Sequence, residues 1–386
     1  MTPADSQNLK PGNWWRKIPP GVWLIIAGLV VSRVILTSLG IQLYRGKILD
    51  TPPDKFAATQ VSSYSWLNTW TPWDAGFYYY IATEWYEIKY PERLYSNRKI
   101  AFFPVYPAAI RVVSHLTGHP YVVGVGLANI FLCGAMLLLY RLVQREDNEA
   151  VARQTVWWQL LFPAAFVFSG MFTESLYLLL ALGCFYSAYQ RRWWLAGLLG
   201  ALLTLTRPLG ILIIAPLVVE YFRQSNWRLR AVRGDILWLG LAPLALTGWM
   251  FYQYQLFHEP LAFLKVQAGW GHQLADPLRQ LWSGLTNSII YYRVLAGYTI
   301  AIGLLLALIQ RRLDWPMRVY AWLSLLVPLC LAVDSMPRYT LVIFPLAIGL
   351  ARQRLSPVIL WPVMVFLILI QLFLFILWPT RETFIL

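Results

Sequence analysis

The stretch LAGLLGALLTLTRPLGILIIAPLVV, residues 195–219, is apolar over nearly its whole length and carries one charged residue, Arg207. A helix of about 20 residues crosses the roughly 30 Å of hydrocarbon in a bilayer. Pro208 interrupts the run, because proline lacks the N–H that a helix interior needs but is favoured at the first position of a new helix. The stretch therefore predicts two apolar membrane helices that meet at an Arg-Pro turn.

Composition extends this prediction to the whole chain. Of its 386 residues, 58% are hydrophobic and 13% are charged, whereas a soluble domain carries about 25% charged residues. Apolar stretches of roughly 15–22 residues recur from end to end, and no separate soluble domain is left over. We therefore predict a single all-α polytopic membrane domain over residues 1–386, with about eleven transmembrane helices. The predicted spans are 22–43, 119–141, 154–171, 173–189, 193–206, 208–222, 236–256, 291–310, 318–333, 339–351 and 358–378.

The connections between these spans predict the orientation of the chain. Alternate connections are short and basic, which marks them as cytoplasmic under the positive-inside rule. The net charge of +14 follows from this topology, so we expect no nucleic-acid partner. The N-terminus, residues 1–21, is then cytoplasmic, and two long loops, 44–103 and 257–290, lie on the outer side. The basic connections are RLVQREDNEAVAR (141–153), QRRWW (190–194), RQSNWRLRAVRGD (223–235), QRRLDWPMR (310–318) and ARQRLS (351–356).

Targeting and cofactor signals are few. The N-terminal segment 14–36 has the basic flank of a signal peptide but no small-residue cleavage site, so we expect a retained first helix. The three cysteines fall inside predicted spans, at spacings that suit neither a disulfide framework nor a zinc site. The four histidines also lack ligand spacing, and no glycine-rich phosphate loop is present. The sequence predicts no metal site and no cofactor, and it leaves open whether a divalent metal assists.

The first outer loop places a carboxylate among aromatic rings. In WDAGFYYYIATEWYEI, residues 73–88, rings recur at helical spacing, and tyrosine and tryptophan are favoured at the membrane–water boundary. We expect this segment to be an interfacial helix. AFFPVYPAAIRVVSHL, residues 101–116, is broken by prolines and is expected to be interfacial or re-entrant. Asp74, at the start of the first segment, fits either a helix N-cap or a general base facing a cleft.

The predicted topology brings two acids and two arginines to the non-cytoplasmic face. Glu174 is either a first-turn acid that complements the helix dipole or part of a site. Arg207 either extends to the interface or binds a phosphate, for which its guanidinium and that of Arg338 are suited. This set predicts an anionic, membrane-borne substrate. The residues predicted to bind it are Glu174, Arg207, Arg338, Lys265, Trp73 and Tyr78, with Asp74 as the catalytic residue.

Several segments, in order along the chain, resemble the PIG-V family, whose eukaryotic member is the second mannosyltransferase of glycosylphosphatidylinositol assembly. The matching segments run from about residue 70 to residue 350. One departure is TRPLG at 206–210, where the eukaryotic members are expected to have TRSNG. The segments are WDAGFYYYIATEWY (73–86), AFFPVYPAAIR (101–111), LFPAAFVFSGMFTESLY (161–177), LTRPLGIL (205–212), YQYQLFHEPLAFLKVQ (252–267) and MPRYTLVIFPL (336–346).

The resemblance implies a GT-C type glycosyltransferase that takes its sugar from a polyprenyl-phosphate carrier on the non-cytoplasmic face. It also implies that Asp74 is the catalytic position. We expect a bacterial inner-membrane enzyme that moves a sugar, mannose by the resemblance, to a lipid-linked or glycan acceptor with inversion. The alternative is a transporter or flippase for a lipid-linked or anionic solute. Clustering of the charges at one face favours chemistry there, because transporters place charges near the middle of their spans.

Overall fold

The computed structural model describes residues 20–45, 62, 64–86, 98–272 and 274–380. The predicted cytoplasmic N-terminus, apart from its last two residues, and much of the loop 44–103 lie outside these ranges. Within them every regular element is a helix, and no strand occurs. This confirms the all-α class predicted from the sequence.

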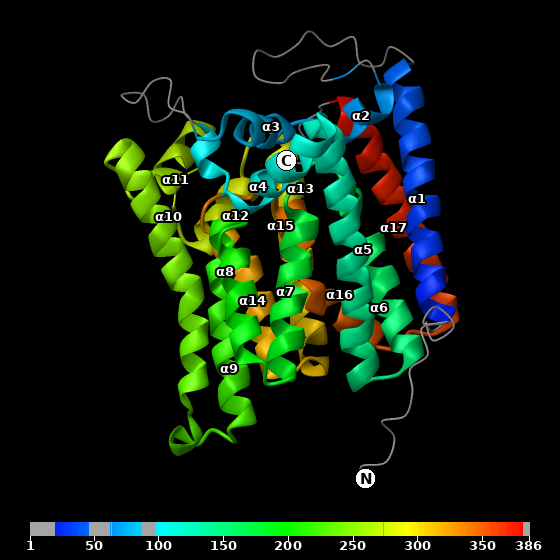
Figure 1. Cartoon of the computed structure of the whole chain (residues 1–386). Helices are drawn as coiled ribbons and strands as arrows, with labels where there is room; N and C mark the ends of the chain where they lie inside the picture. Colours follow the sequence, from blue (N-terminus) through cyan, green and yellow to red (C-terminus); the bar gives the residue numbers. More distant parts are fainter. Residues whose placement is uncertain (1–19, 46–61, 63, 87–97, 273, 381–386) are drawn as a thin grey trace, which may run out of the picture.

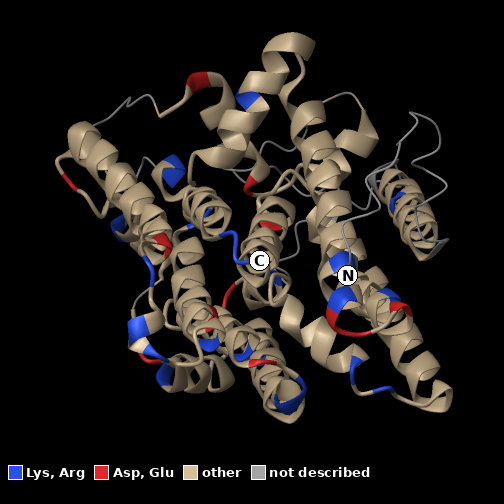
Figure 2. Ribbon diagram, turned by 60° about the horizontal axis from the view of Figure 1, so that its bottom comes forward, with Lys and Arg blue, Asp and Glu red and all other residues tan. Residues whose placement is uncertain are grey.

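Within the described ranges, five helical segments are long and apolar enough to cross a membrane, and they run along the length of the molecule (Figure 1). Charged residues are also sparse, since most of the helical ribbon carries neither an acidic nor a basic residue (Figure 2). The segments are α1 (Pro20–Arg45), α5 (Pro120–Glu146), η7 (Gly234–Gly240) with α10 (Leu241–Phe257), α13 (Ile290–Ile309) and α17 (Pro357–Thr380).

Shorter helices, of 16 residues at most, occupy the other six predicted spans. The predicted count of about eleven transmembrane helices therefore stays a prediction. Proline explains where several of these spans break, because the residue before a proline disfavours the helical conformation. The predicted span 154–171 stops at Leu161, since Phe162 precedes Pro163 and is extended. The shorter helices are α6 (Glu149–Leu161), α7 (Glu174–Tyr189), α8 (Trp193–Thr204), α9 (Ile214–Gln224), α14 (Trp315–Leu329), α15 (Met336–Thr340) and α16 (Phe344–Ala351).

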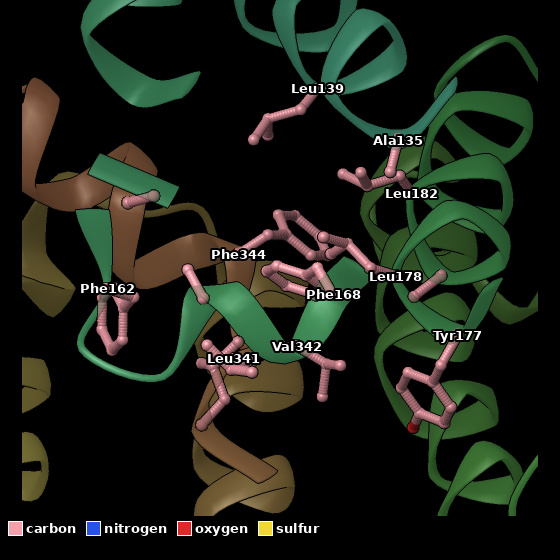
Figure 3. Close-up of a cluster of buried hydrophobic side chains, with 14 of the residues drawn as sticks. Ala135, Leu139, Phe162, Phe168, Tyr177, Leu178, Leu182, Leu341, Val342 and Phe344 are labelled. Carbon is pink, nitrogen blue, oxygen red and sulfur yellow. The ribbon is translucent and has the colours of Figure 1, made fainter. Parts of the chain in front are cut away.

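Helix α7 lies at the centre of the bundle and is buried along almost all of its length. Phe168, from the turn before α7, packs with Phe344 and with Leu178 and Leu182 of α7 in one cluster (Figure 3). Close packing of large rings of this kind fixes the first residue of α7, Glu174, relative to its neighbours.

Short helices form a layer at one end of the bundle, the upper end in Figure 1. Helix α4 is 13 residues long, which is about 20 Å and too short to cross the hydrocarbon. Parts of the two predicted outer loops meet in this layer, because η3 of the first loop contacts α11 and η8 of the second. The layer contains α2 (Ser65–Trp70), α3 (Ala75–Glu84), η3 (Arg98–Ala101), α4 (Val105–Thr117), α11 (Ala262–Lys265), η8 (Val266–Trp270) and α12 (Pro277–Leu285).

The basic connections gather at the opposite end of the bundle. Arg352, from the connection 351–356, donates to Asp147 and Glu146 of the connection 141–153. Tyr189, at the end of α7, donates to Asp314 of the connection 310–318. Three of the basic connections thus contact one another at one end of the bundle, and the orientation of the chain in the membrane stays a prediction.

Helix α8 approaches η7 so closely at Gly197 that a larger residue at this position should disturb the packing of the two elements. A Cβ atom at Gly197 would lie 2.1 Å from the carbonyl oxygen of Trp238, a backbone atom that cannot rotate away. We expect Gly197→Ala to destabilise the protein by about 1–3 kcal/mol through overpacking. The measurement is the apparent Tm of the purified protein in detergent, followed by tryptophan fluorescence.

Gly248→Ala, in α10, is the matched control, because a Cβ atom there meets nothing within 4 Å. Alanine favours a helix over glycine, so this variant should keep or slightly raise the Tm. Equal Tm values for the two variants would contradict the predicted clash.

Candidate active site

Asp74 occupies the N-cap position of α3, but its carboxylate caps nothing. Its Oδ2 instead accepts a hydrogen bond from Nη1 of Arg338 at 2.9 Å. The residue before it, Trp73, has a left-handed backbone with φ of 57°, which is uncommon for a bulky residue and often occurs at functional sites. The N-cap alternative for Asp74 is therefore wrong, because the side chain turns away from the helix toward the arginine.

Glu174 is the first residue of α7 and is fully buried. Its Oε1 accepts from two arginines, Nη2 of Arg207 at 2.6 Å and Nε of Arg338 at 2.9 Å. Its Oε2 is buried and has no hydrogen-bond partner. A buried carboxylate is stable only when it is paired, so the two arginines hold Glu174 ionised in the bundle.

Arg207 lies in the extended connection between α8 and η5 (Pro208–Ile213), where the following proline favours an extended backbone. Besides Glu174, it contacts Thr173, whose Oγ1 accepts from its Nε at 2.5 Å. Its side chain is 13% exposed. The interpretation of Arg207 as an arginine that extends to the interface is therefore wrong, since its guanidinium points inward.

Arg338 lies in α15, which begins after Ser335, a residue with φ of 59°. Its guanidinium lies over the ring of Phe172, 4.8 Å from the ring centroid. Contacts of this kind are worth about 2 kcal/mol when they are desolvated. The ring therefore restricts Arg338 to one orientation, in which it bridges Asp74 and Glu174.

These contacts form a continuous chain of charges, Asp74–Arg338–Glu174–Arg207, which we call the ion-pair chain. Its centre is closed to solvent, since the side chains of Glu174 and Arg338 are 0% and 8% exposed. Its ends are more open, with Asp74 28% exposed and Arg207 13% exposed. The ion-pair chain therefore offers the Asp74 carboxylate at one end and the Arg207 guanidinium at the other end to a ligand, while its central pair stays fixed.

Tyr78 meets the ion-pair chain indirectly, because its hydroxyl lies 3.3 Å from Oγ1 of Thr173. Burial raises the pKa of Tyr78 to about 12, so the phenol is protonated at neutral pH. Trp73 is half-buried, and its Nε1 is buried without a hydrogen-bond partner. The expected binding of a substrate by these two rings stays a prediction.

Lys265 is placed differently from the other predicted binding residues. It lies in α11, its ammonium group pairs with Glu259, and its side chain is 55% exposed. The hydrogen bond from Lys265 lowers the pKa of the Glu259 carboxyl. No contact of Lys265 reaches the ion-pair chain within the described part of the protein, so its role in phosphate binding stays a prediction.

Two residues of the site were missed from the sequence, Phe172 and Thr173. Both immediately precede Glu174 in MFTES, and their proximity to a predicted site acid was the available signal.

The described ranges hold no group of three or more His, Cys, Asp or Glu side chains arranged to bind a metal ion.

Comparison with known proteins finds similar folds among solved structures but no similar sequence. No family model and no curated protein sequence matches the chain, so the relation to the PIG-V family stays a prediction. The crystal structure of ArnT from Cupriavidus metallidurans, bound to undecaprenyl phosphate, is similar, with a TM-score of 0.52 and 13% sequence identity. The match covers 90% of this chain but 63% of the ArnT chain, less than two thirds of its length. At this identity the likeness concerns the fold alone, and the predicted fold class, an all-α polytopic fold of the kind seen in ArnT, is confirmed.

Proposed function

We propose that the protein is a GT-C glycosyltransferase that uses a polyprenyl-phosphate-sugar donor and a lipid-linked or glycan acceptor. The observation that carries this proposal is the ion-pair chain, which presents a carboxylate and a guanidinium beside the layer of short helices. The fold shared with ArnT, whose structure contains a polyprenyl phosphate, supports the choice of donor.

In the proposed reaction, Asp74 accepts the proton of the acceptor hydroxyl as that oxygen attacks the anomeric carbon. The bond between this carbon and the phosphate oxygen breaks, the electron pair leaves with the phosphate, and the anomeric configuration inverts. Arg207, at the open end of the ion-pair chain, binds the phosphate through charge-assisted hydrogen bonds, and Arg338 holds Asp74 and adds positive charge beside it. Help from a general base is worth about 10²–10⁴ in rate, and positioning of donor and acceptor supplies the remainder.

Features of the sequence support the proposed side of the membrane and the proposed sugar. The basic connections lie at the end opposite to the ion-pair chain, and under the positive-inside rule this supports a site on the non-cytoplasmic face. The resemblance to the PIG-V family supports mannose as the sugar, and a bacterial inner membrane stays the expected location. Transport is less well supported, because the four charges pair with one another at one end of the bundle.

The role of Asp74 predicts that Asp74→Asn lowers the transfer rate by about 10²-fold or more. Asparagine keeps an oxygen that can accept from Arg338, so the fold and donor binding should survive. The assay supplies radiolabelled polyprenyl-phosphate mannose and a membrane extract to the purified protein in liposomes, and it follows label in the product.

Asp276→Asn is the matched control, because Asp276 is an acid of the same layer that caps α12, and asparagine caps a helix equally well. This variant should transfer label at the rate of the wild type. An Asp74→Asn enzyme as active as the control would refute the assignment of the base.

The geometry of Arg207 predicts that a lysine cannot replace it. Lysine has one nitrogen and no fork, so it cannot contact Thr173 and Glu174 and still offer donors to a phosphate. We expect Arg207→Lys to raise the KM for the donor about tenfold or more, which matches the loss of a hydrogen bond to a charged group. Initial rates over a range of donor concentrations give this value.

Arg293→Lys, at an exposed position in α13, retains the charge in the same way and should leave the KM unchanged. If Arg207→Lys behaves like this control, then Arg207 does not bind the donor phosphate.

A further inference from the structure

Helix α1 lies at the edge of the bundle (Figure 1), where it packs on α2, α5, α6 and α17. A groove of about 440 Å³ runs between α1 and α5. None of the residues that line it belongs to the ion-pair chain. Five apolar side chains line much of the groove around a single charged one, Arg33. They are Ile26, Leu29, Val30 and Val34 of α1 and Leu132 of α5.

Arg33 places a positive charge near the middle of the membrane. It is one residue from the midpoint of the candidate span Gly21–Leu43, and it is the one charged residue in that span. The two ends of the span lie about 15–18 Å away along the helix, which is farther than an arginine side chain extends. Arg33 therefore does not reach the lipid head groups of either leaflet.

The described part of the chain supplies no counter-charge for Arg33. None of its ion pairs includes this arginine, and Nε of Arg33 is buried without a hydrogen-bond partner. A charged side chain within the hydrocarbon is costly and normally pairs with an opposite charge. Lipid chains carry no charge, so a carboxylate at the same depth of the membrane is the group that would neutralise Arg33.

A second copy of this chain does not offer such a carboxylate. Glu174 and Glu220 are the only acids in the eleven spans predicted from the sequence. Both are fully buried, and each already pairs with an arginine of its own chain. The carboxylate therefore belongs to a different membrane protein, on a helix that crosses the bilayer.

The surface around Arg33 suits a helix at close range. Val30 and Val34 line the groove one turn apart and are 57% and 59% exposed. On α5, Gly126 lies one turn before Asn129, which lines the groove, and a Cβ atom at Gly126 would meet nothing within 4 Å. Small residues let membrane helices approach closely, and serine hydroxyls, such as that of exposed Ser38, form hydrogen bonds between them.

We propose that this groove is the docking site for a different membrane protein, through a transmembrane helix that carries Asp or Glu near its middle. The carboxylate of that helix pairs with Arg33, and its apolar side chains cover Val30 and Val34. The interaction goes beyond the proposed transfer reaction, because the groove uses neither Asp74 nor Arg207.

The first test measures binding of synthetic leucine-rich transmembrane peptides to the purified full-length protein in phosphatidylcholine liposomes. The peptides carry glutamate at the centre, leucine at the centre, glutamate near one end, or lysine at the centre. Energy transfer from the labelled protein to a labelled peptide gives each Kd in the membrane. The variants are Arg33→Gln, which removes the charge, Arg33→Glu, which reverses it, and Arg141→Gln, which removes an exposed arginine elsewhere on α5.

We expect the wild type and Arg141→Gln to bind the central-glutamate peptide at least threefold more tightly than the other three, which corresponds to one polar contact between membrane helices. Arg33→Gln should lose this preference and keep the wild-type Tm, and Arg33→Glu should prefer the lysine peptide. Equal binding of the central-glutamate and central-leucine peptides by the wild type would overturn the proposal. The same preference in Arg33→Gln, no preference for lysine in Arg33→Glu, or a lower Tm of Arg33→Gln would also overturn it.

The second test identifies the partner in cells that make the protein naturally. Val34 is replaced by the photoreactive residue p-benzoylphenylalanine, the membranes are irradiated, and mass spectrometry identifies the cross-linked product. We expect a different membrane protein with Asp or Glu near the middle of a transmembrane helix, and Arg33→Gln should abolish its capture. Cross-links to lipid alone, to a second copy of this chain, or to a protein without such an acid would contradict the proposal.

Discussion

One carboxylate oxygen, Oε1 of Glu174, holds the site together. It accepts from two arginines that are 33 and 164 residues away in sequence, and so joins the start of α7, the connection after α8, and α15. Removing one partner of a buried ion pair typically costs about 3–5 kcal/mol, because an uncompensated charge remains. The orientation of Asp74 depends on this oxygen as well, since Arg338 binds both acids.

The backbone around Glu174 is arranged to bring helix starts together. Asp74 precedes the first residue of α3, Glu174 is the first residue of α7, and Arg207 precedes the first residue of η5. Helix N-termini carry partial positive charge and free N–H groups, and they attract anions. The four side chains of the ion-pair chain balance one another in charge, and in the proposed function the helix starts add a preference for a negatively charged ligand. Left-handed backbone at Trp73 and Ser335 provides the sharp turns that this convergence requires.

Much of this could be predicted from the sequence, and the remainder depends on long-range contacts. Proline marked the break at Arg207, and the alternation of basic connections placed the four charged residues at one end. The sequence did not indicate which acid binds which arginine, because Asp74 and Arg338 are 264 residues apart. It grouped Lys265 with the site because of its place in an outer loop, whereas Glu259, six residues earlier, binds its ammonium group. The contribution of Phe172 was also hidden, since a phenylalanine in an apolar segment looks like core until a guanidinium is found over its ring.

In the proposed reaction, the fixed arginines of the ion-pair chain favour the transfer step over tight binding of the donor. In the proposed reaction the donor phosphate is a diester with one negative charge, and the released polyprenyl phosphate is a monoester that carries about −1.5 to −2 at pH 7. Negative charge therefore grows on the phosphate as the bond to the sugar breaks. Arginines fixed in advance by Glu174, Thr173 and Phe172 stabilise that growing charge without having to reorganise, which is the condition for catalysis by electrostatic preorganisation. Because the same arginines bind the donor less strongly than the transition state, their interaction energy lowers the barrier instead of only tightening the complex.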